Sequence, residues 1–399
     1  MTIKKGAVLL IFLIQLLFFG HIYAQNVQLT IKVIAKQNIP KTDSMVVMGN
    51  QAVFGNWFDF SKGKMAKQDD TTWVLKNTFP VNTTIEFQVT HGSYFKNALY
   101  TYGKYQAPKV PFVIKKDTTI VIHPENWNDL FSRGITGTIK YYHNFEDHDL
   151  KYTRDVMVWL PPSYYKSPNK RYPVLYAHDG QNIFAQNSVF NGEWRMDETA
   201  DSLMRIGKTE EFIIVGIANT KDRWAEYSGT PEGTAYINFI IHNLKPFVDA
   251  QFRTKADKNN TAAIGSSMGG LISFYMVWLH PEVFSKAACL SSGFAYDDGH
   301  IVDKVAVSPR KIPGTRVYLD CGDQDLDKYF LADNERMKTL LEEKHPEIKL
   351  MYRVFKGGAH NEFAWAKRLD IPLVYLFGKN GAGKNVRIKT NHKTDKQKQ

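Results

Sequence analysis

Cysteine is scarce in this chain, with only Cys289 and Cys321 among its 399 residues. This scarcity excludes a small domain held together by disulfides, and it leaves no cysteine near the N-terminus for lipid attachment. Both cysteines fall in segments that we predict to be core strands, so we expect buried free thiols. Long apolar runs are also absent after residue 19, which argues against any later membrane-spanning helix.

The first 24 residues have the pattern of a secretory signal peptide. Lys4 and Lys5 precede an apolar stretch, Ala7–Phe19, which is short for a membrane span. Ala24 is a small residue at a suitable cleavage point before Gln25. We therefore expect cleavage after residue 24 and export of the protein to the periplasm or the medium. An uncleaved N-terminal anchor is the alternative.

The formal net charge of +11 is concentrated at one end of the chain. Residues 379–399 hold seven basic residues against one acidic residue, with few large apolar side chains. This composition predicts a disordered basic tail. Nothing in the rest of the chain indicates recognition of bases, so we expect no nucleic-acid partner.

Residues 25–125 have the pattern of an all-β domain. Short apolar runs are separated by turn residues, and no helical period intervenes. The predicted strands are 29–34, 44–48, 72–75, 85–89 and 118–122. This spacing predicts a small β-sandwich.

From about residue 135 to 378 the pattern changes to alternating strands and helices. The segment 235–252 repeats apolar residues at helical spacing. Compact apolar strands are predicted at 174–177, 212–218, 261–264, 286–290, 315–320 and 350–355. The alternation predicts an α/β fold with a doubly wound, mostly parallel sheet.

One short segment of this second domain points to covalent catalysis. Gly265-Ser266-Ser267-Met268-Gly269 joins a predicted strand to a predicted helix. A strained turn of this kind presents a serine hydroxyl above the sheet, and glycine is needed two residues before and after it. Only Ser267 has glycine at both positions. Ser267 is therefore the candidate nucleophile.

A serine nucleophile needs a base and an acid that holds the base. In the hydrolase order the acid follows one late strand and the histidine follows the next. His360 follows the strand 350–355, in Gly357-Gly358-Ala359-His360. The acid is less determined, because Asp320, Asp323, Asp325 and Asp327 all lie at or beyond the end of the preceding strand.

The second domain resembles the esterase D-like family, which includes feruloyl and acetyl xylan esterases and enterochelin esterases. The resemblance rests on Val158–Tyr164, Ala177–Phe184, Arg223–Tyr227, Gly265–Gly270 and Gly357–His360. It implies an α/β-hydrolase fold and a serine esterase activity. The family's Gly-x-x-Asp/Glu turn, carried over to Gly322–Asp325, selects Asp325 as the acid, with Asp323 as the fallback.

The position of two loops predicts the donors that would stabilise an oxyanion. The N–H group of Met268 begins the helix after Ser267. The second donor should come from the loop 178–181, where we expect the N–H of Gln181. An acidic, histidine-containing patch at residues 143–149 lacks the spacing of a metal-binding loop. We expect no metal and no cofactor.

The first domain resembles the starch-binding family of carbohydrate-binding modules. The matching residues are Gly49–Trp57, Trp73 and Ile85–Phe87. The resemblance makes Trp57, Trp73 and Tyr94 candidates for sugar binding, since flat aromatic faces pack against sugar rings. The alternatives are that the tryptophans belong to the sandwich core and that the domain only shapes the cleft of the second domain.

Together these observations predict an exported serine carboxylic ester hydrolase. The expected substrate is a small-molecule or oligosaccharide ester, with a feruloyl or acetyl group on a carbohydrate, and a polysaccharide is a candidate partner. A siderophore esterase of the enterochelin type is the alternative enzyme. A non-catalytic carbohydrate-binding protein is the alternative class. The pattern does not place the candidate pocket residues Trp194 and Trp224.

Overall fold

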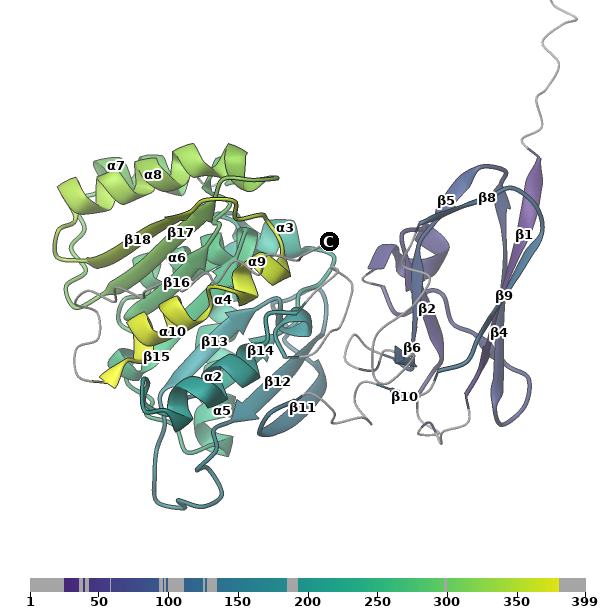
Figure 1. The fold of residues 1–399 in the computed structure, drawn as a ribbon, viewed down its shortest axis with the longest axis horizontal. Coiled ribbons are helices and arrows are strands. Elements are labelled where there is room, and N and C mark those ends of the chain that lie inside the picture. Colours follow the sequence, from purple (N-terminus) through teal and green to yellow (C-terminus); the bar gives the residue numbers. More distant parts are fainter. Residues whose placement is uncertain are drawn as a thin grey trace, which may run out of the picture.

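The computed structural model shows two folded domains (Figure 1). It describes residues 25–35, 39, 43–57, 59–92, 96, 98–99, 111–124, 126–127, 135–184, 193–297 and 300–379. The predicted signal peptide and almost all of the predicted basic tail lie outside the described residues. Within the described part of the chain, no helix is long and apolar enough to cross a membrane.

The N-terminal domain is built from strands. Its largest sheet has four strands in the order β3-β4-β1-β9. In this sheet β1 (Asn26–Ile34) pairs antiparallel with β4 (Thr72–Pro80) and parallel with β9 (Thr118–Ile122). The edge strand β3 spans Ala66–Lys67. Side chains of β1 alternate between core and solvent, as the period of a half-buried strand requires.

Three two-stranded pairs complete the described part of this domain. These are β2 (Val46–Gly49) with β6 (Phe87–Thr90), β5 (Thr83–Ile85) with β8 (Phe112–Ile114), and β7 (Ala98–Leu99) with β10 (Asn126–Trp127). A short 3-10 helix, η1, spans Ala52–Trp57. One apolar cluster takes side chains from β1, β2, β4 and β6 and forms the core. The expected all-β domain is therefore present.

The second domain is organised around one eight-stranded sheet in the order β11-β12-β14-β13-β15-β16-β17-β18. The strands β11 and β12 run antiparallel to their neighbours, and those from β14 to β18 are parallel. The bounds are β11 Thr138–Phe145, β12 Arg154–Leu160, β13 Val174–His178, β14 Ile213–Ile217, β15 Thr261–Ser266, β16 Lys286–Leu290, β17 Arg316–Gly322 and β18 Lys349–Phe355. The prediction of a mostly parallel sheet is confirmed.

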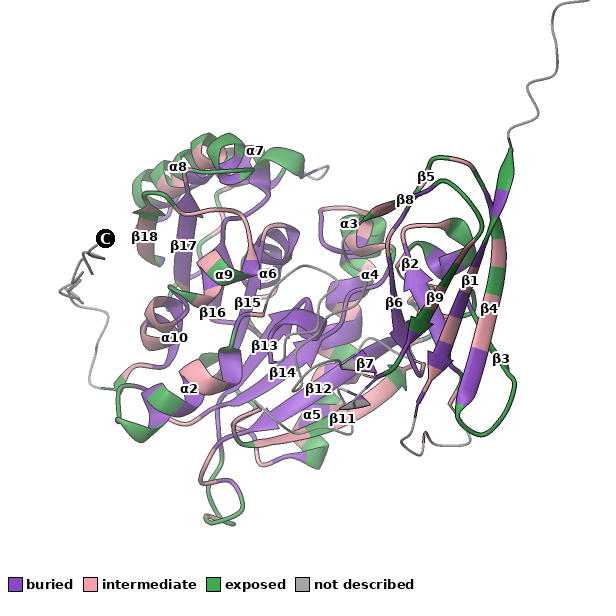
Figure 2. Cartoon of the chain, turned by 45° about the vertical axis from the view of Figure 1, so that its right-hand side comes forward, coloured by how far each residue is buried: buried purple, intermediate pink, exposed green. Residues whose placement is uncertain are grey.

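Helices cover both faces of this sheet. One face packs against α4 (Pro231–Phe239), α5 (Lys245–Gln251), α6 (Met268–Leu279), α7 (Ile301–Val307) and α8 (Asp327–Lys344). The other packs against α2 (Met196–Arg205), α9 (Glu362–Ala366) and α10 (Asp370–Phe377). A π-helical turn, Ile240–Leu244, joins α4 to α5, so the predicted helix at 235–252 is present with an internal bulge. Figure 2 shows the central strands buried between these layers.

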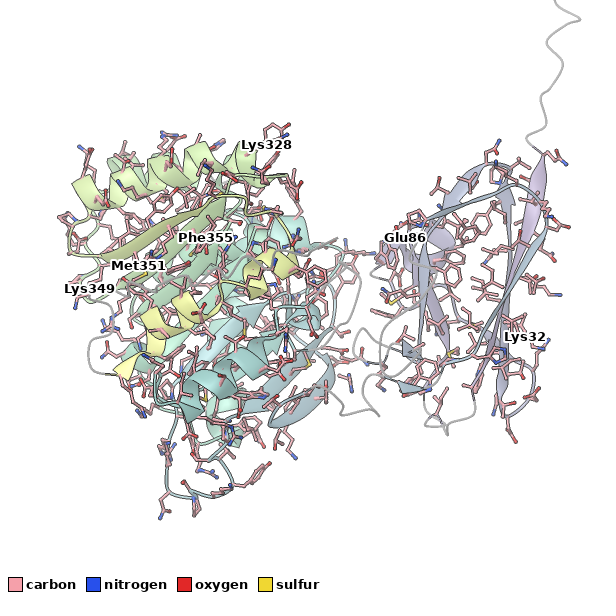
Figure 3. The ribbon with its side chains drawn as sticks, in the orientation of Figure 1. Lys32, Glu86, Lys328, Lys349, Met351 and Phe355 are labelled. Carbon is pink, nitrogen blue, oxygen red and sulfur yellow. The ribbon has the colours of Figure 1, made fainter. Side chains whose placement is uncertain are left out.

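The direction of the parallel strands determines where loops gather. Figure 3 labels both ends of β18, with Lys349 at its start and Phe355 at its end. Lys328, in the first turn of α8, lies at the Phe355 end. The loops at this edge of the sheet follow the carboxyl ends of the strands, where doubly wound folds build their sites. Cys289 and Cys321 are buried free thiols, as expected.

Candidate active site

Ser267 occupies a strained turn between β15 and α6. Its backbone angles are φ 57° and ψ −125°, a positive-φ conformation that few non-glycine residues adopt. A Cβ atom on Gly265 would lie 2.4 Å from the carbonyl carbon of Gly269. The turn therefore requires glycine at position 265, for the steric reason that the sequence suggested.

Backbone hydrogen bonds hold this turn in place. The Ser267 N–H donates to the carbonyl of Leu290 at 2.9 Å, and the Gly293 N–H donates to the carbonyl of Ser267 at 3.0 Å. Leu290 ends the neighbouring strand β16, and Gly293 follows it. The Ser267 backbone is thus tied to the sheet, and Met268 begins a helix whose first N–H groups lack intrahelical acceptors.

His360 lies in the loop between β18 and α9, and its partner is Asp327. The two atoms His360 Nδ1 and Asp327 Oδ1 are 2.6 Å apart. The Asp327 side chain is fully buried at the start of α8, and 9% of the His360 side chain is exposed. The ring of His360 also contacts Phe330 and Trp365 edge-on, with centroids 4.9 and 5.0 Å away.

The choice of Asp325 as the acid needs correction on this geometry. Asp325 is exposed and sits in a left-handed turn at φ 52°. The fallback, Asp323, accepts the backbone N–H of Gly357 at 2.7 Å and an amide N–H of Gln324 at 2.9 Å. The turn that leaves β17 directs both side chains away from the core. Two residues later the chain enters α8, and Asp327 turns inward to His360.

A buried network holds the Asp327 carboxylate. Its Oδ2 accepts the N–H of Gly322 at 2.7 Å and lies 2.7 Å from the hydroxyl oxygen of Ser291. That hydroxyl oxygen accepts N–H groups from Trp365 at 3.0 Å and Arg368 at 2.8 Å. Because tryptophan and arginine side chains only donate, the Ser291 proton is left for Asp327.

Arg368 extends the network to a second buried carboxylate. It donates to Asp320 Oδ1 at 2.9 Å, and Tyr318 donates its hydroxyl to Asp320 Oδ2 at 2.8 Å. Burial raises the pKa of Asp320, while the Arg368 guanidinium opposes that rise. Asp320 therefore belongs to the buried network that holds Asp327.

Ser267 and His360 line one cavity of about 450 Å³. Its wall includes the tryptophans Trp194 and Trp365, and the polar residues Asn182 and Glu362. Asn182 Nδ2 lies 3.4 Å from Glu362 Oε1, and both side chains are almost completely buried. The cavity thus has an aromatic side and a polar side.

The loop after β13 contributes polar residues to the same cavity. Arg223 makes two hydrogen bonds to Asp179, at 2.7 and 2.8 Å, and the Asn219 amide adds a third at 2.6 Å. Both Asp179 and Arg223 line the cavity. His178 is buried against Tyr236, and this burial lowers its pKa to about 3. His178 is therefore uncharged and supports the loop.

Gln181, the expected second oxyanion donor, lies in the short 3-10 helix Gly180–Asn182 of this loop. Its side chain is buried, and its Oε1 accepts the backbone N–H of Asn219 at 3.2 Å. The loop is therefore anchored to the residues after β14. The role of the Gln181 and Met268 N–H groups stays a prediction.

The segment Arg223–Tyr227, which carried part of the family resemblance, has two structural roles. Arg223 faces the cavity, whereas Glu226 turns to the core and binds Arg154 on β12. The Arg154 guanidinium donates to both Glu226 oxygens, at 3.1 and 2.7 Å, and both side chains are buried. This pair ties α3 (Arg223–Glu226) to the sheet.

Two of the three sugar-binding candidates, Trp57 and Trp73, lie within the described part of the N-terminal domain. Trp73 is 9% exposed and belongs to the core of this domain. Lys67 Nζ lies 5.9 Å from its ring centroid, so little of the ring is open to a sugar, which corrects its assignment as a binding platform. Trp57 is half-buried at the end of η1. Tyr94 lies outside the described residues.

The acidic patch at residues 143–149 brings the ligand atoms of Asp147, His148 and Asp149 within 4.8 Å of one another. Asp147 already accepts hydrogen bonds from the side-chain amide of Asn243 and from the N–H of Asp149. Asp149 and His148 are exposed. The patch is a hydrogen-bonded surface turn.

The chain resembles known proteins over this domain. The uncharacterized protein YbbA of Bacillus subtilis (strain 168) is 25% identical over 249 residues, which cover 57% of this chain and 94% of that protein. An endo-1,4-beta-xylanase/feruloyl esterase of Xylanibacter ruminicola is 29% identical over 228 residues, which cover 55% of this chain and 29% of that protein.

A solved structure extends the likeness to both domains. The enterobactin esterase FES from Shigella flexneri matches 87% of this chain and 92% of its own chain, with 14% identity and a TM-score of 0.52. At this identity the match shows a shared fold. The model of the family described as "Putative esterase" matches residues 148–374, more than half of the chain. The chain therefore belongs to the "Putative esterase" family.

Proposed function

We propose that this protein is a serine carboxylic ester hydrolase with Ser267 as nucleophile, His360 as base and Asp327 as acid. The observation that carries the proposal is the 2.6 Å hydrogen bond between His360 and Asp327, in the cavity that the strained Ser267 also lines. A buried carboxylate on Nδ1 leaves Nε2 of the imidazole to take the serine proton.

The reaction would follow the usual two acyl-transfer steps. His360 removes the proton of Ser267 as its oxygen attacks the ester carbonyl, and then returns that proton to the leaving alcohol. Water, activated by the same histidine, releases the acid from the acyl-enzyme. The backbone N–H groups of Met268 and Gln181 are the proposed donors to the oxyanion. No step requires a metal or a cofactor.

The proposed substrate is an acyl ester on a carbohydrate, with a feruloyl or acetyl group. Support comes from the Xylanibacter ruminicola relative, which is described as a feruloyl esterase and is 29% identical over the shared region. The aromatic side of the cavity, with Trp194 and Trp365, fits a planar acyl group. A siderophore ester is the alternative, since the enterobactin esterase shares the two-domain fold. Export through residues 1–24 and a starch-binding-like role of the N-terminal domain are part of the proposal.

A hydrolysis panel tests this function. The purified protein is assayed with 4-nitrophenyl acetate, methyl ferulate, a feruloylated oligosaccharide and a catecholate siderophore, beside Ser267→Ala. We expect turnover of carbohydrate esters that falls about 10⁴- to 10⁶-fold in the variant, since the nucleophile is lost. Faster hydrolysis of the siderophore would select the alternative substrate. A Ser267→Ala protein that keeps normal turnover would overturn the mechanism. Retention on starch without any hydrolysis would favour the non-catalytic class.

A further inference from the structure

A line of aromatic rings leads from His360 to the protein surface. Phe330, on α8, lies 4.9 Å from the His360 ring, and Tyr296 lies 5.3 Å from Phe330. Trp224, on α3, contacts Tyr296 at 5.9 Å. The three rings beyond His360 come from three separate elements. Tyr296 ends the short helix Phe294–Tyr296, which lies between α6 and α7 in the chain.

The outer two rings are exposed beside a second cavity. Trp224 is 51% exposed and Tyr296 is 43% exposed. They line a cavity of about 390 Å³ together with His300, Asp303, Asp333 and Arg336. Isolated exposed rings are ordinary, but a contacting pair that lines a cavity next to a reactive centre indicates a binding surface.

We propose that this cavity, the Trp224–Tyr296 subsite, binds a sugar ring in the alcohol part of the ester. The inference rests on the proposed function, because it places the acyl carbonyl at Ser267. A sugar presents a flat C–H face and a rim of hydroxyl groups. Trp224 and Tyr296 offer apolar ring faces that can pack against the C–H face. Asp333 and the ion pair of Arg336 with Asp303, at 2.5 Å, offer hydrogen-bonding groups for the sugar hydroxyls.

The charged groups distinguish a sugar from an aryl group as the occupant. An aryl acyl group would gain little from two carboxylates and a guanidinium, and the catalytic cavity already offers it the contacting rings of Trp194 and Trp365, whose centroids are 5.8 Å apart. The successive ring-to-ring distances of 4.9, 5.3 and 5.9 Å limit the separation of Trp224 from His360 to a span that a short oligosaccharide can cover. A glycan can therefore extend from the scissile ester to the subsite.

The two rings of the Trp224–Tyr296 subsite are held in place by neighbouring residues before any ligand binds. The residue before Trp224, Arg223, is fixed by its two hydrogen bonds to Asp179. The carbonyl of Trp224 itself accepts the Ser228 hydroxyl at 3.0 Å. On the other side, Tyr296 packs on the buried ring of Phe330. Binding to such a fixed surface loses little conformational entropy.

The test compares Trp224→Ala and Tyr296→Ala with the wild-type protein on three esters. 4-Nitrophenyl acetate reports the chemistry, methyl ferulate reports an aryl acyl group without sugar, and a feruloylated arabinoxylan oligosaccharide reports the glycan. We expect KM for the oligosaccharide to rise about threefold to tenfold in each variant, as loss of one stacked ring predicts. Both small esters should be hydrolysed as by the wild type. Tyr165→Ala is the matched control, since Tyr165 is 64% exposed and packs on Tyr164.

The remaining outcomes of these assays also decide whether the subsite binds a sugar. An equal loss on methyl ferulate would make the cavity an aryl site and overturn the proposal. Variants that match the wild type on the oligosaccharide would also overturn it, while leaving the esterase function intact. If the wild type hydrolyses no ester, the proposed function fails, and the subsite is then decided by calorimetric titration of xylotetraose into the wild type and Trp224→Ala. Equal binding or no binding in that titration would overturn the subsite, and weaker binding by the variant would support it.

Discussion

The imidazole of His360 and the carboxylate of Asp327 meet at 2.6 Å across the ends of two neighbouring strands. Asp327 follows β17 by five residues, and His360 follows β18 by five residues. Their contact therefore joins the start of α8 to the loop before α9. Since Asp327 is fully buried, the carboxylate that holds His360 is shielded from water.

The first expectation concerns the acid. Asp327→Asn should lower kcat by about 10⁴-fold, because an amide would hold the wrong tautomer of His360. Asp325→Asn makes the same chemical change two residues away, on an exposed side chain, and should leave kcat unchanged. Steady-state kinetics on 4-nitrophenyl acetate, with melting curves for both variants, checks this. The opposite ranking would restore Asp325 as the acid.

The second expectation concerns Ser291, which acts through Asp327. Ser291→Ala removes the hydroxyl donated to Asp327 and the acceptor shared by Trp365 and Arg368. We expect a loss of about 1–3 kcal/mol in the free energy of unfolding, and a lower kcat with an unchanged KM. Ser291→Cys keeps an unbranched side chain with a weak donor, which suits the φ of 43° at this position, and should restore part of kcat.

Ser292→Ala is the matched control, because Ser292 is equally buried but its hydroxyl has no hydrogen-bond partner among the described residues. It should change kcat and stability little. An equal fall in kcat for both alanine variants would refute a specific role of Ser291 in positioning Asp327.

The third expectation concerns the buried ion pair of Arg154 and Glu226. Glu226→Gln should destabilise the protein by about 3–5 kcal/mol, because the Arg154 charge would remain buried without its counter-charge. Glu342→Gln, in an exposed pair with Lys338 on α8, is the control and should change the free energy of unfolding little. Urea denaturation measures both. A small effect of Glu226→Gln would mean that water or another group compensates Arg154.

The fourth expectation is a pH dependence. Burial and, to a lesser extent, the negative charge of Glu198 raise the pKa of Glu193 to about 7. An ordinary glutamate in the unfolded chain has a pKa near 4.5. Between these values the folded state binds more protons, so this residue reduces stability as pH rises from 4.5 to 7. Glu193→Gln should therefore be more stable than the wild type at pH 8 and equal to it near pH 4.5. A difference in melting temperature that does not change with pH would contradict this.

Local patterns were sufficient for the parallel strands of the large sheet, β13 to β18, and for the turn at Ser267. Apolar residues recur every two residues in a strand and about every four in a helix, so both patterns can be recognised from residues that are close in the chain. The alternation of the two patterns predicted the sheet. The glycine requirement is also local, because the Gly265 and Gly269 backbones meet within one turn. His360 could be placed because one strand, β18, directly precedes its loop.

The acid could not be chosen in the same way. Four aspartates within eight residues follow or end β17, and all have the same chemistry. Which one reaches His360 depends on the direction in which the chain leaves the turn at Asp325 and enters α8. One feature could have singled out Asp327, because it is the first residue of a helix. The resemblance to the family's Gly-x-x-Asp/Glu turn selected Asp325 instead.

The sequence by itself determined the α/β order, the Ser267 turn and the position of His360, since each depends on residues that are close in the chain. Tertiary structure alone decided the pairing of Asp327 with His360, the support from Ser291 and Arg368, and the burial of Trp73. These depend on contacts between distant segments, such as that between Ser291 and Arg368, which are 77 positions apart in the chain. Side-chain direction in a packed core is a property of the whole fold, because each group's hydrogen-bond partner lies on another element.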